Sequence, residues 1–166
     1  MSSLMISRRS MMVGAAAGLA ACSTGMRPYT GPEVTRIQVF KERREMQLLH
    51  HRTLLKSYTF ELGFQPVGHK VYEGDGRTPE GAYLIDRRNP NSSFHLSLGI
   101  SYPNARDVAV ARSLGKEPGG DIFIHGTPDV WADTPDWTWG CIAVTNREMD
   151  EIYPMVQTGT LITIYA

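Results

Sequence analysis

The stretch DIFIHGTPDVWADTPDWTWGCIAV occupies residues 121–144 and constrains the fold more than any other part of the chain. It opens with a short apolar run that ends at His125, and an apolar run follows Cys141. Between these runs, glycine and proline alternate with aromatic and acidic residues, a composition typical of loops. Short apolar runs separated by such loops predict β-strands rather than long helices.

The flanking sequence continues the strand pattern in both directions. Polar and apolar residues alternate most clearly in VTRIQVF (34–40) and FHLSLGI (94–100), as expected of strands with one buried face. Further strands are expected over residues 46–50, 54–62, 82–86, 121–125 and 160–165. Short helices are expected over residues 108–114 and 146–156, the second opening with a capping box of Thr145 and Glu148. The sequence therefore predicts a mainly β domain.

The composition excludes several classes of protein. The chain has 166 residues, enough for one domain with its own core. Its 42% apolar and 20% charged content are ordinary for a globular protein, which argues against disorder over the whole length. Lys and Arg number 17, as do Asp and Glu, so the basic surplus of a nucleic-acid-binding protein is missing. Two cysteines are too few for a disulfide scaffold.

Residues 1–21 have the layout of an export signal. Arg8 and Arg9, which resemble a twin-arginine signal, precede an uncharged run that is too short to span a bilayer. The sequence LAAC, ending at Cys22, resembles a bacterial lipobox, in which the cysteine becomes acylated. We therefore expect an exported protein on the periplasmic face, anchored to a membrane through lipid on Cys22. Plain cleavage after an alanine and an uncleaved cytoplasmic chain are the alternatives.

The remainder of the chain divides into a linker and a domain. Residues 22–33 are predicted to be a linker, because glycine and proline recur in them, and residues 34–166 to be the folded domain. Cleavage after residue 21 removes Arg8 and Arg9 and leaves 15 basic and 17 acidic residues, a net charge of −2. Membrane attachment would then depend on acyl chains and not on charge.

Cys141 is the candidate nucleophile. If Cys22 carries lipid, Cys141 is an unpaired thiol in an oxidising compartment. A buried structural thiol and a disulfide with Cys22 are the non-catalytic interpretations. Gly140 allows close approach of a substrate, and His125 lies sixteen residues earlier. A free thiol has a pKa of about 8.5 and needs a nearby imidazole to react at neutral pH, and a Cys/His pair is the minimum for covalent acyl transfer.

These residues resemble the signature of the L,D-transpeptidase catalytic domain, the YkuD-like family. That signature is a His-Gly pair followed by Ser/Thr-His-Gly-Cys, and here His125-Gly126 leads to Thr138-Trp139-Gly140-Cys141. A second family element, Thr-Pro-x-Gly, matches residues 78–81, after GHK at 68–70 and GDG at 74–76. The resemblance covers residues 34–166 and implies a β-sandwich or barrel with one or two short helices.

The resemblance also implies an activity and the role of each site residue. A peptidoglycan L,D-transpeptidase in cell wall biogenesis would use Cys141 to form a thioester with stem tetrapeptides. His125 would act as general base and then acid, oriented by the backbone carbonyl of Gly126, while backbone N–H groups around Gly140 and Cys141 would hold the oxyanion. The family needs no metal or organic cofactor. Its implied partners are peptidoglycan stem peptides and, in one branch, a peptidoglycan-linked lipoprotein.

Two positions depart from the family pattern. Trp139 stands where the family has histidine, so the motif reads WTWGC in place of SHGC, and Ala143 stands where Arg or Asn is usual. The chain therefore resembles a divergent branch whose members include a hydrolytic amidase that detaches lipoprotein from peptidoglycan. Hydrolysis at the same site and a non-catalytic peptidoglycan-binding lipoprotein are the two alternative functions.

Four residues are candidates for substrate binding: Thr138, Trp139, His95 and His69. His95 lies in the predicted strand 94–100, where it faces either the cleft or solvent. His69 lies in a loop beside Lys70, where contact with a substrate carboxylate and plain exposure are both open. The chain has no His-x-His or His-x-x-x-His pair, so no zinc peptidase site is predicted. Asp133 and Asp136 are expected to solvate their loop.

Overall fold

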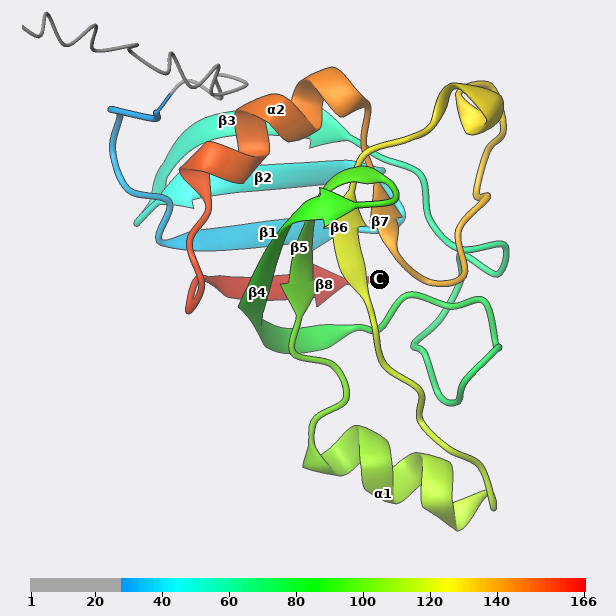
Figure 1. Cartoon of the computed structure of the whole chain (residues 1–166). Helices are drawn as coiled ribbons and strands as arrows, with labels where there is room; N and C mark the ends of the chain where they lie inside the picture. Colours follow the sequence, from blue (N-terminus) through cyan, green and yellow to red (C-terminus); the bar gives the residue numbers. More distant parts are fainter. Residues whose placement is uncertain (1–27) are drawn as a thin grey trace, which may run out of the picture.

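One curled sheet dominates the computed structural model of the chain, which describes residues 28–166 (Figure 1). Within these residues its eight strands are β1 (Arg36–Phe40), β2 (Glu45–His50), β3 (Thr53–Thr59), β4 (Gly81–Ser92), β5 (His95–Ile100), β6 (Phe123–His125), β7 (Ile142–Ala143) and β8 (Leu161–Tyr165). The helices are α1 (Ala105–Ser113), the 3-10 helix η1 (Asp129–Trp131) and α2 (Asn146–Met155). The strand order is β3-β2-β1-β8-β4-β5-β6-β7. The prediction of a mainly β fold is confirmed.

Strand β4 bends the sheet. Its residues 81–84 pair with β8, whereas Ile85 and the residues after it pair with β5. The register shifts between Ile85 and Arg87, as it does at a β-bulge, which bends a strand and increases its twist. β4 runs to Ser92, well past the predicted end at residue 86, because pairing with β5 imposes strand geometry on the polar RRNPNS segment. Pro90 is accommodated at a second register shift.

The two edges of the sheet are joined by the segment that follows β3. Glu61 donates its N–H to the carbonyl of Ala143 in β7 at 2.8 Å, and Ala143 donates back to Glu61 at 2.9 Å. Gly63 forms a further bridge with Thr138. The predicted strand 54–62 therefore ends at Thr59, because the chain leaves β2 there and crosses to β7. The crossing covers the β7 edge, which would otherwise carry unpaired backbone groups.

The core lies inside the curled sheet and under α2. In β1, Ile37 and Val39 are fully buried while their neighbours are partly exposed, as the alternating sequence predicts. Helix α2 packs on β5 and buries Met149 and Ile152. The largest fully buried side chains are Ile37, Met46, Leu48, Leu62, Ile85, Leu98, Ile100, Ile124, Ile142, Met149, Ile152 and Ile162. This core fixes the positions of β6 and β7, the strands that carry the site.

Both α-helices begin with capping boxes. The predicted pair of Thr145 and Glu148 caps α2. Helix α1 begins at Ala105, three residues before its predicted start, because the Asn104 side chain accepts the N–H groups of Arg106 and Asp107. Within residues 28–166 no helix is both long and apolar enough to cross a membrane.

The predicted signal, the lipidation site Cys22 and the first part of the linker lie outside the described residues. The export and anchoring of the chain stay predictions.

An ion pair between Arg44 and Asp136 anchors the loop that precedes Cys141. The Arg44 guanidinium donates to both carboxylate oxygens, and the Leu62 N–H donates to Asp136 Oδ1 at 3.1 Å. Burial raises the pKa of Asp136, but the hydrogen bonds and charge of Arg44 and the Leu62 N–H outweigh it, so the pKa is lowered. Asp136 is therefore a tertiary anchor, and the expectation that it only solvates the loop was wrong.

We expect Asp136→Ala to lower the free energy of unfolding by about 1–3 kcal/mol, because it leaves Arg44 and the Leu62 N–H without their acceptor. Urea unfolding at pH 7 measures the change. Asp133→Ala, in the exposed part of the same loop, is the matched control and should stay within about 0.5 kcal/mol of the parent. The contribution of Asp136 should be complete above the ordinary carboxyl pKa of about 3.9 and disappear as the pH falls through its lower folded value. Equal unfolding midpoints for the two variants would contradict this role.

Candidate active site

His125 ends β6 and is held by its neighbours on all sides. β6 pairs with β5 on one side and, in parallel, with β7 on the other, where His125 lies opposite Ala143. The imidazole is only 3% exposed. The Phe94 ring stacks on it at 4.7 Å between centroids, and the Trp137 ring meets it edge-on at 5.5 Å. Two aromatic side chains therefore fix the plane of the ring.

The backbone of the next residue fixes the tautomer. His125 Nδ1 lies 2.7 Å from the Gly126 carbonyl oxygen, which can only accept, so Nδ1 carries the proton and Nε2 is left as the basic nitrogen. Gly126 itself donates its N–H to the Phe94 carbonyl at 3.0 Å. A Cβ at position 126 would collide with the Asn146 side chain. The predicted hydrogen bond between His125 and Gly126 is present.

The imidazole is neutral in the resting protein. Burial lowers the pKa of His125 below its ordinary value, and the hydrogen bond to the Gly126 carbonyl offsets only part of that effect. Near neutral pH the unprotonated form therefore prevails, which is the form that a general base requires.

Cys141 directly precedes β7, the strand that pairs with β6. Ile142 is buried in the core, and Ala143, two residues after Cys141, lies opposite His125. The half-buried thiol lies 3.5 Å from the Asp121 carbonyl, and no hydrogen bond joins it to His125 in the described part of the chain.

The thiol is protonated at rest. Burial raises the pKa of Cys141 to about 11, and the Asp121 charge adds to that rise. The Phe123 N–H and the positive charge of Lys70 act in the opposite direction. The structure thus contains a thiol and a neutral imidazole rather than a preformed thiolate–imidazolium pair, so attack by Cys141 requires proton transfer to a base.

Thr138 shapes the turn that precedes Cys141. Its side chain is 3% exposed, donates to the Cys141 carbonyl at 2.8 Å and accepts the Gly140 N–H at 3.1 Å. The Gly140 N–H, one of the two donors predicted to hold an oxyanion, is therefore occupied by Thr138 in this structure. In the described residues the Cys141 N–H has no acceptor, so it is the backbone donor left for that task. Thr138 supports the turn from within, and its contacts are with the protein.

We expect Gly140→Ala to distort this turn and to lower the rate of Cys141 alkylation or acylation about tenfold. Gly140 has φ +121°, and an added Cβ would lie 2.5 Å from the Arg77 carbonyl oxygen. Backbone must move to relieve that contact, and displacement of a reacting group by about 1 Å can cost up to a hundredfold in rate. Gly115→Ala is the control, since Gly115 has φ +68° but open space around it. Equal reactivity of the two variants would show that the close contact is unimportant.

The other candidate residues have their own protein partners. His95 Nε2 lies 2.6 Å from Asp150 on α2, and His69 accepts the Glu80 N–H at 2.9 Å while facing Asp107. These contacts account for the positions of both histidine side chains without a substrate. In the described residues neither side chain forms a hydrogen bond with the Cys141 thiol. His95 begins β5 with φ +70° instead of lying mid-strand. Trp139 is 71% exposed and packs edge-on against Phe64, and it is the most exposed of the four candidates.

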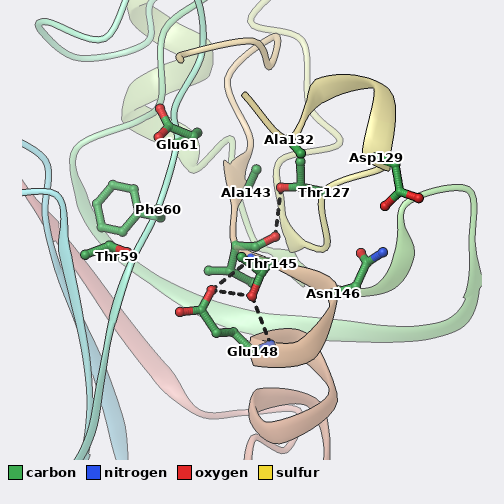
Figure 2. Close-up of a pocket in the computed structure, with 11 residues that line it drawn as sticks. Thr59, Phe60, Glu61, Thr127, Asp129, Ala132, Ala143, Thr145, Asn146 and Glu148 are labelled. Carbon is green, nitrogen blue, oxygen red and sulfur yellow. Dashed lines mark hydrogen bonds between the residues drawn. The ribbon is translucent and has the colours of Figure 1, made fainter. Parts of the chain in front are cut away.

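A pocket of about 260 Å³ lies beside Ala143 (Figure 2). Figure 2 shows it between the segment after β3, the η1 loop and the start of α2, with Ala143 on its wall. Neither Cys141 nor His125 lines it. Its Glu148 carboxylate accepts from Thr145, and its Thr127 hydroxyl donates to the Val144 carbonyl at 2.8 Å. The small Ala143 side chain, where the family has Arg or Asn, leaves this space open.

No group of three potential metal-ligating side chains gathers anywhere in residues 28–166. Two features near the site were not predicted from the sequence. They are the packing of Phe94 and Trp137 on His125 and the buried ion pair of Lys70 and Asp75. The GHK and GDG motifs were the visible signal for the second feature.

Residues 34–164 match the family model of the L,D-transpeptidase catalytic domain (YkuD). The chain belongs to this family. A curated member of similar sequence is the Escherichia coli (strain K12) protein named "Putative L,D-transpeptidase YafK", 35% identical over 132 residues that cover 76% of this chain and 48% of YafK. This L,D-transpeptidase domain thus spans about half the length of that relative.

Solved structures agree on the fold. The helical cell shape determining protein Pgp2 from Campylobacter jejuni matches 82% of this chain and 49% of its own, with 23% identity and a TM-score of 0.64. An L,D-transpeptidase from Mycobacterium smegmatis matches 80% of this chain and 59% of its own, with 12% identity and a TM-score of 0.55. The predicted L,D-transpeptidase fold is confirmed.

Proposed function

We propose that this domain is an active peptidoglycan L,D-transpeptidase that acts through a thioester on Cys141. The observation that carries the proposal is the neutral, buried His125, whose Nδ1 is tied to the Gly126 carbonyl and which lies opposite Ala143, two residues after Cys141. Membership of the L,D-transpeptidase family supports the reaction class.

The site can perform both halves of an acyl transfer. His125 Nε2 takes the thiol proton as Cys141 Sγ attacks the carbonyl carbon between the third and fourth stem residues. The C–N bond breaks, the imidazolium protonates the departing D-alanine amine, and a thioester remains. An amine of a second stem then attacks, His125 takes its proton, and the thiol is regenerated. The Cys141 N–H stabilises the oxyanion at each stage.

Stem tetrapeptides are the proposed donor, and the exposed Trp139 beside the nucleophile is the proposed contact for them. The proposed setting is the periplasmic face of a membrane, with the domain held by lipid on Cys22. The support for this setting is the sequence pattern of residues 1–22.

Product analysis tests the activity. The chain is incubated with disaccharide tetrapeptides and, separately, with sacculi that carry linked lipoprotein, and the products are weighed by mass spectrometry. Cross-linked dimers with release of D-alanine support transpeptidation. Stem tripeptide or freed lipoprotein without dimers would indicate that the domain hydrolyses its substrate instead of cross-linking it. No product and no covalent adduct with a carbapenem would identify a binding protein instead.

A further inference from the structure

Lys70 and Asp75 form a buried ion pair that the reaction described above does not use. Their side chains are 3% and 4% exposed, and Lys70 Nζ lies 2.9 Å from Asp75 Oδ1. Removing two charges from water is costly, and apolar replacements are often as stable as a buried pair. Stability alone is therefore a weak explanation for this pair, and its position in the molecule is informative.

Asp75 organises the loop that carries the pair. Its carboxylate accepts the N–H groups of Val71 at 2.6 Å, Tyr72 at 3.1 Å and Arg77 at 3.0 Å, besides the Lys70 ammonium. Burial raises the pKa of Asp75, but these hydrogen bonds outweigh it and lower the pKa, so the carboxylate stays ionised. Lys70 is thus bound to a fixed negative charge inside a rigid loop.

The same loop presses directly on the turn that holds the nucleophile. The Arg77 carbonyl lies so close to Gly140 that no side chain fits there, and the Gly76 carbonyl leaves no room for one at Gly63. The Gln65 N–H also donates to the Gly76 carbonyl at 3.1 Å. The loop that carries Lys70 is therefore in backbone contact with the turn that precedes Cys141, whether or not a substrate is bound.

The ammonium has a donor to spare. Of the three N–H bonds of Lys70 Nζ, one is directed to Asp75 and one to the Tyr72 carbonyl at 3.2 Å. The third has no acceptor in the described part of the chain. Its charge acts on the Cys141 thiol, where it favours the thiolate. The other groups that act on the thiol are the Phe123 N–H and the exposed Asp121, which disfavours the thiolate and pairs with Arg87.

We propose that Lys70, fixed by Asp75, is a positioning residue that stabilises the negative charge on Cys141 Sγ during attack and during breakdown of the thioester. The inference deepens the proposed function and rests on Cys141 being its nucleophile. His125 removes the proton, and Lys70 stabilises the anion that its removal leaves on the sulfur. This division of tasks explains how a half-buried, protonated thiol can react without a charged histidine beside it.

The pH dependence of Cys141 alkylation tests this role without any peptidoglycan. The full chain carrying Cys22→Ser has one thiol, and its reaction with iodoacetamide is followed by mass spectrometry from pH 6 to pH 11. We expect Lys70→Met to lower the rate at pH 8 about tenfold by moving the profile to higher pH, because a neighbouring charge changes a thiol pKa by one unit or more. Lys70→Arg should retain most of the parent rate.

Two further variants keep the test decisive. Lys70→Met/Asp75→Asn removes both charges and leaves no unpaired ion to unfold the loop, and it should show the same shift as Lys70→Met. Lys56→Met, which removes an exposed lysine paired with Glu151, should leave the profile unchanged. A parent-like profile in a folded Lys70 variant would overturn the inference. A shifted profile in a chain that makes no cross-links would uphold it while the transpeptidase proposal fails.

Discussion

Cys141→Ala should abolish cross-linking of stem tetrapeptides and should leave the protein without a carbapenem adduct. In the proposed mechanism the thiol accepts the acyl group, and loss of a covalent nucleophile costs about four orders of magnitude in rate or more. The fold should survive, because the side chain is half-buried and its hydrogen bonds in the described residues are with backbone groups, the Asp121 carbonyl and the Phe123 N–H. Mass spectrometry of the products and of the intact protein measures both effects.

The second cysteine supplies the matched control. Cys22→Ser removes the proposed lipid attachment but no part of the site, so the purified variant should retain turnover on soluble disaccharide tetrapeptides. Survival of activity in Cys141→Ala would mean that another group carries the acyl chain.

His125→Gln should lower the rate about 10²- to 10⁴-fold, the range contributed by a general acid–base. Glutamine can donate to the Gly126 carbonyl as the imidazole does, but it cannot accept a proton from the thiol. The parent enzyme should lose activity as the pH falls through the His125 pKa, because protonation removes the base. Since burial lowers that pKa, the loss should occur below the ordinary histidine value of about 6.5. The pH profile of kcat/KM between pH 4 and pH 8 measures it.

The histidines with protein partners are the controls for this experiment. His95→Gln and His69→Gln remove side chains that contact Asp150 and Asp107, so they should retain the parent rate and the parent pH profile. An acid limb that persists unchanged in His125→Gln would assign the titration to another group.

Strand positions were largely predictable from sequence, because alternation and punctuation are local signals. The strands at 36–40, 45–50 and 161–165 and the cap of α2 lie where these signals put them. The misjudged boundaries all depend on distant partners. β4 extends to Ser92 because β5 pairs with it, and β3 ends at Thr59 because the next residues cross to Ala143. A segment that becomes a strand because a distant strand pairs with it has no distinguishing pattern in its own sequence.

In the site, too, contacts between neighbouring residues were easier to predict than contacts between distant ones. The pairing of His125 with the Gly126 carbonyl involves adjacent residues and could be expected from a motif. The occupation of the Gly140 N–H by Thr138 was not expected, although the two residues are neighbours, because a hydroxyl can rotate toward several acceptors and donors. The Arg44–Asp136 anchor spans 92 residues and depends wholly on the closure of the sheet.

The sequence by itself determined the family and the β class and pointed to Cys141 and His125 as the proposed catalytic pair, because each depends on residue type at short spacing. Only the tertiary structure decided the protonation of that pair, since burial and neighbouring charges set the pKa of a side chain. It also decided which histidines are held by carboxylates and that Lys70 is buried in an ion pair with Asp75. Protonation states and ion pairs depend on which groups lie close together in space, and the curled sheet brings these groups together.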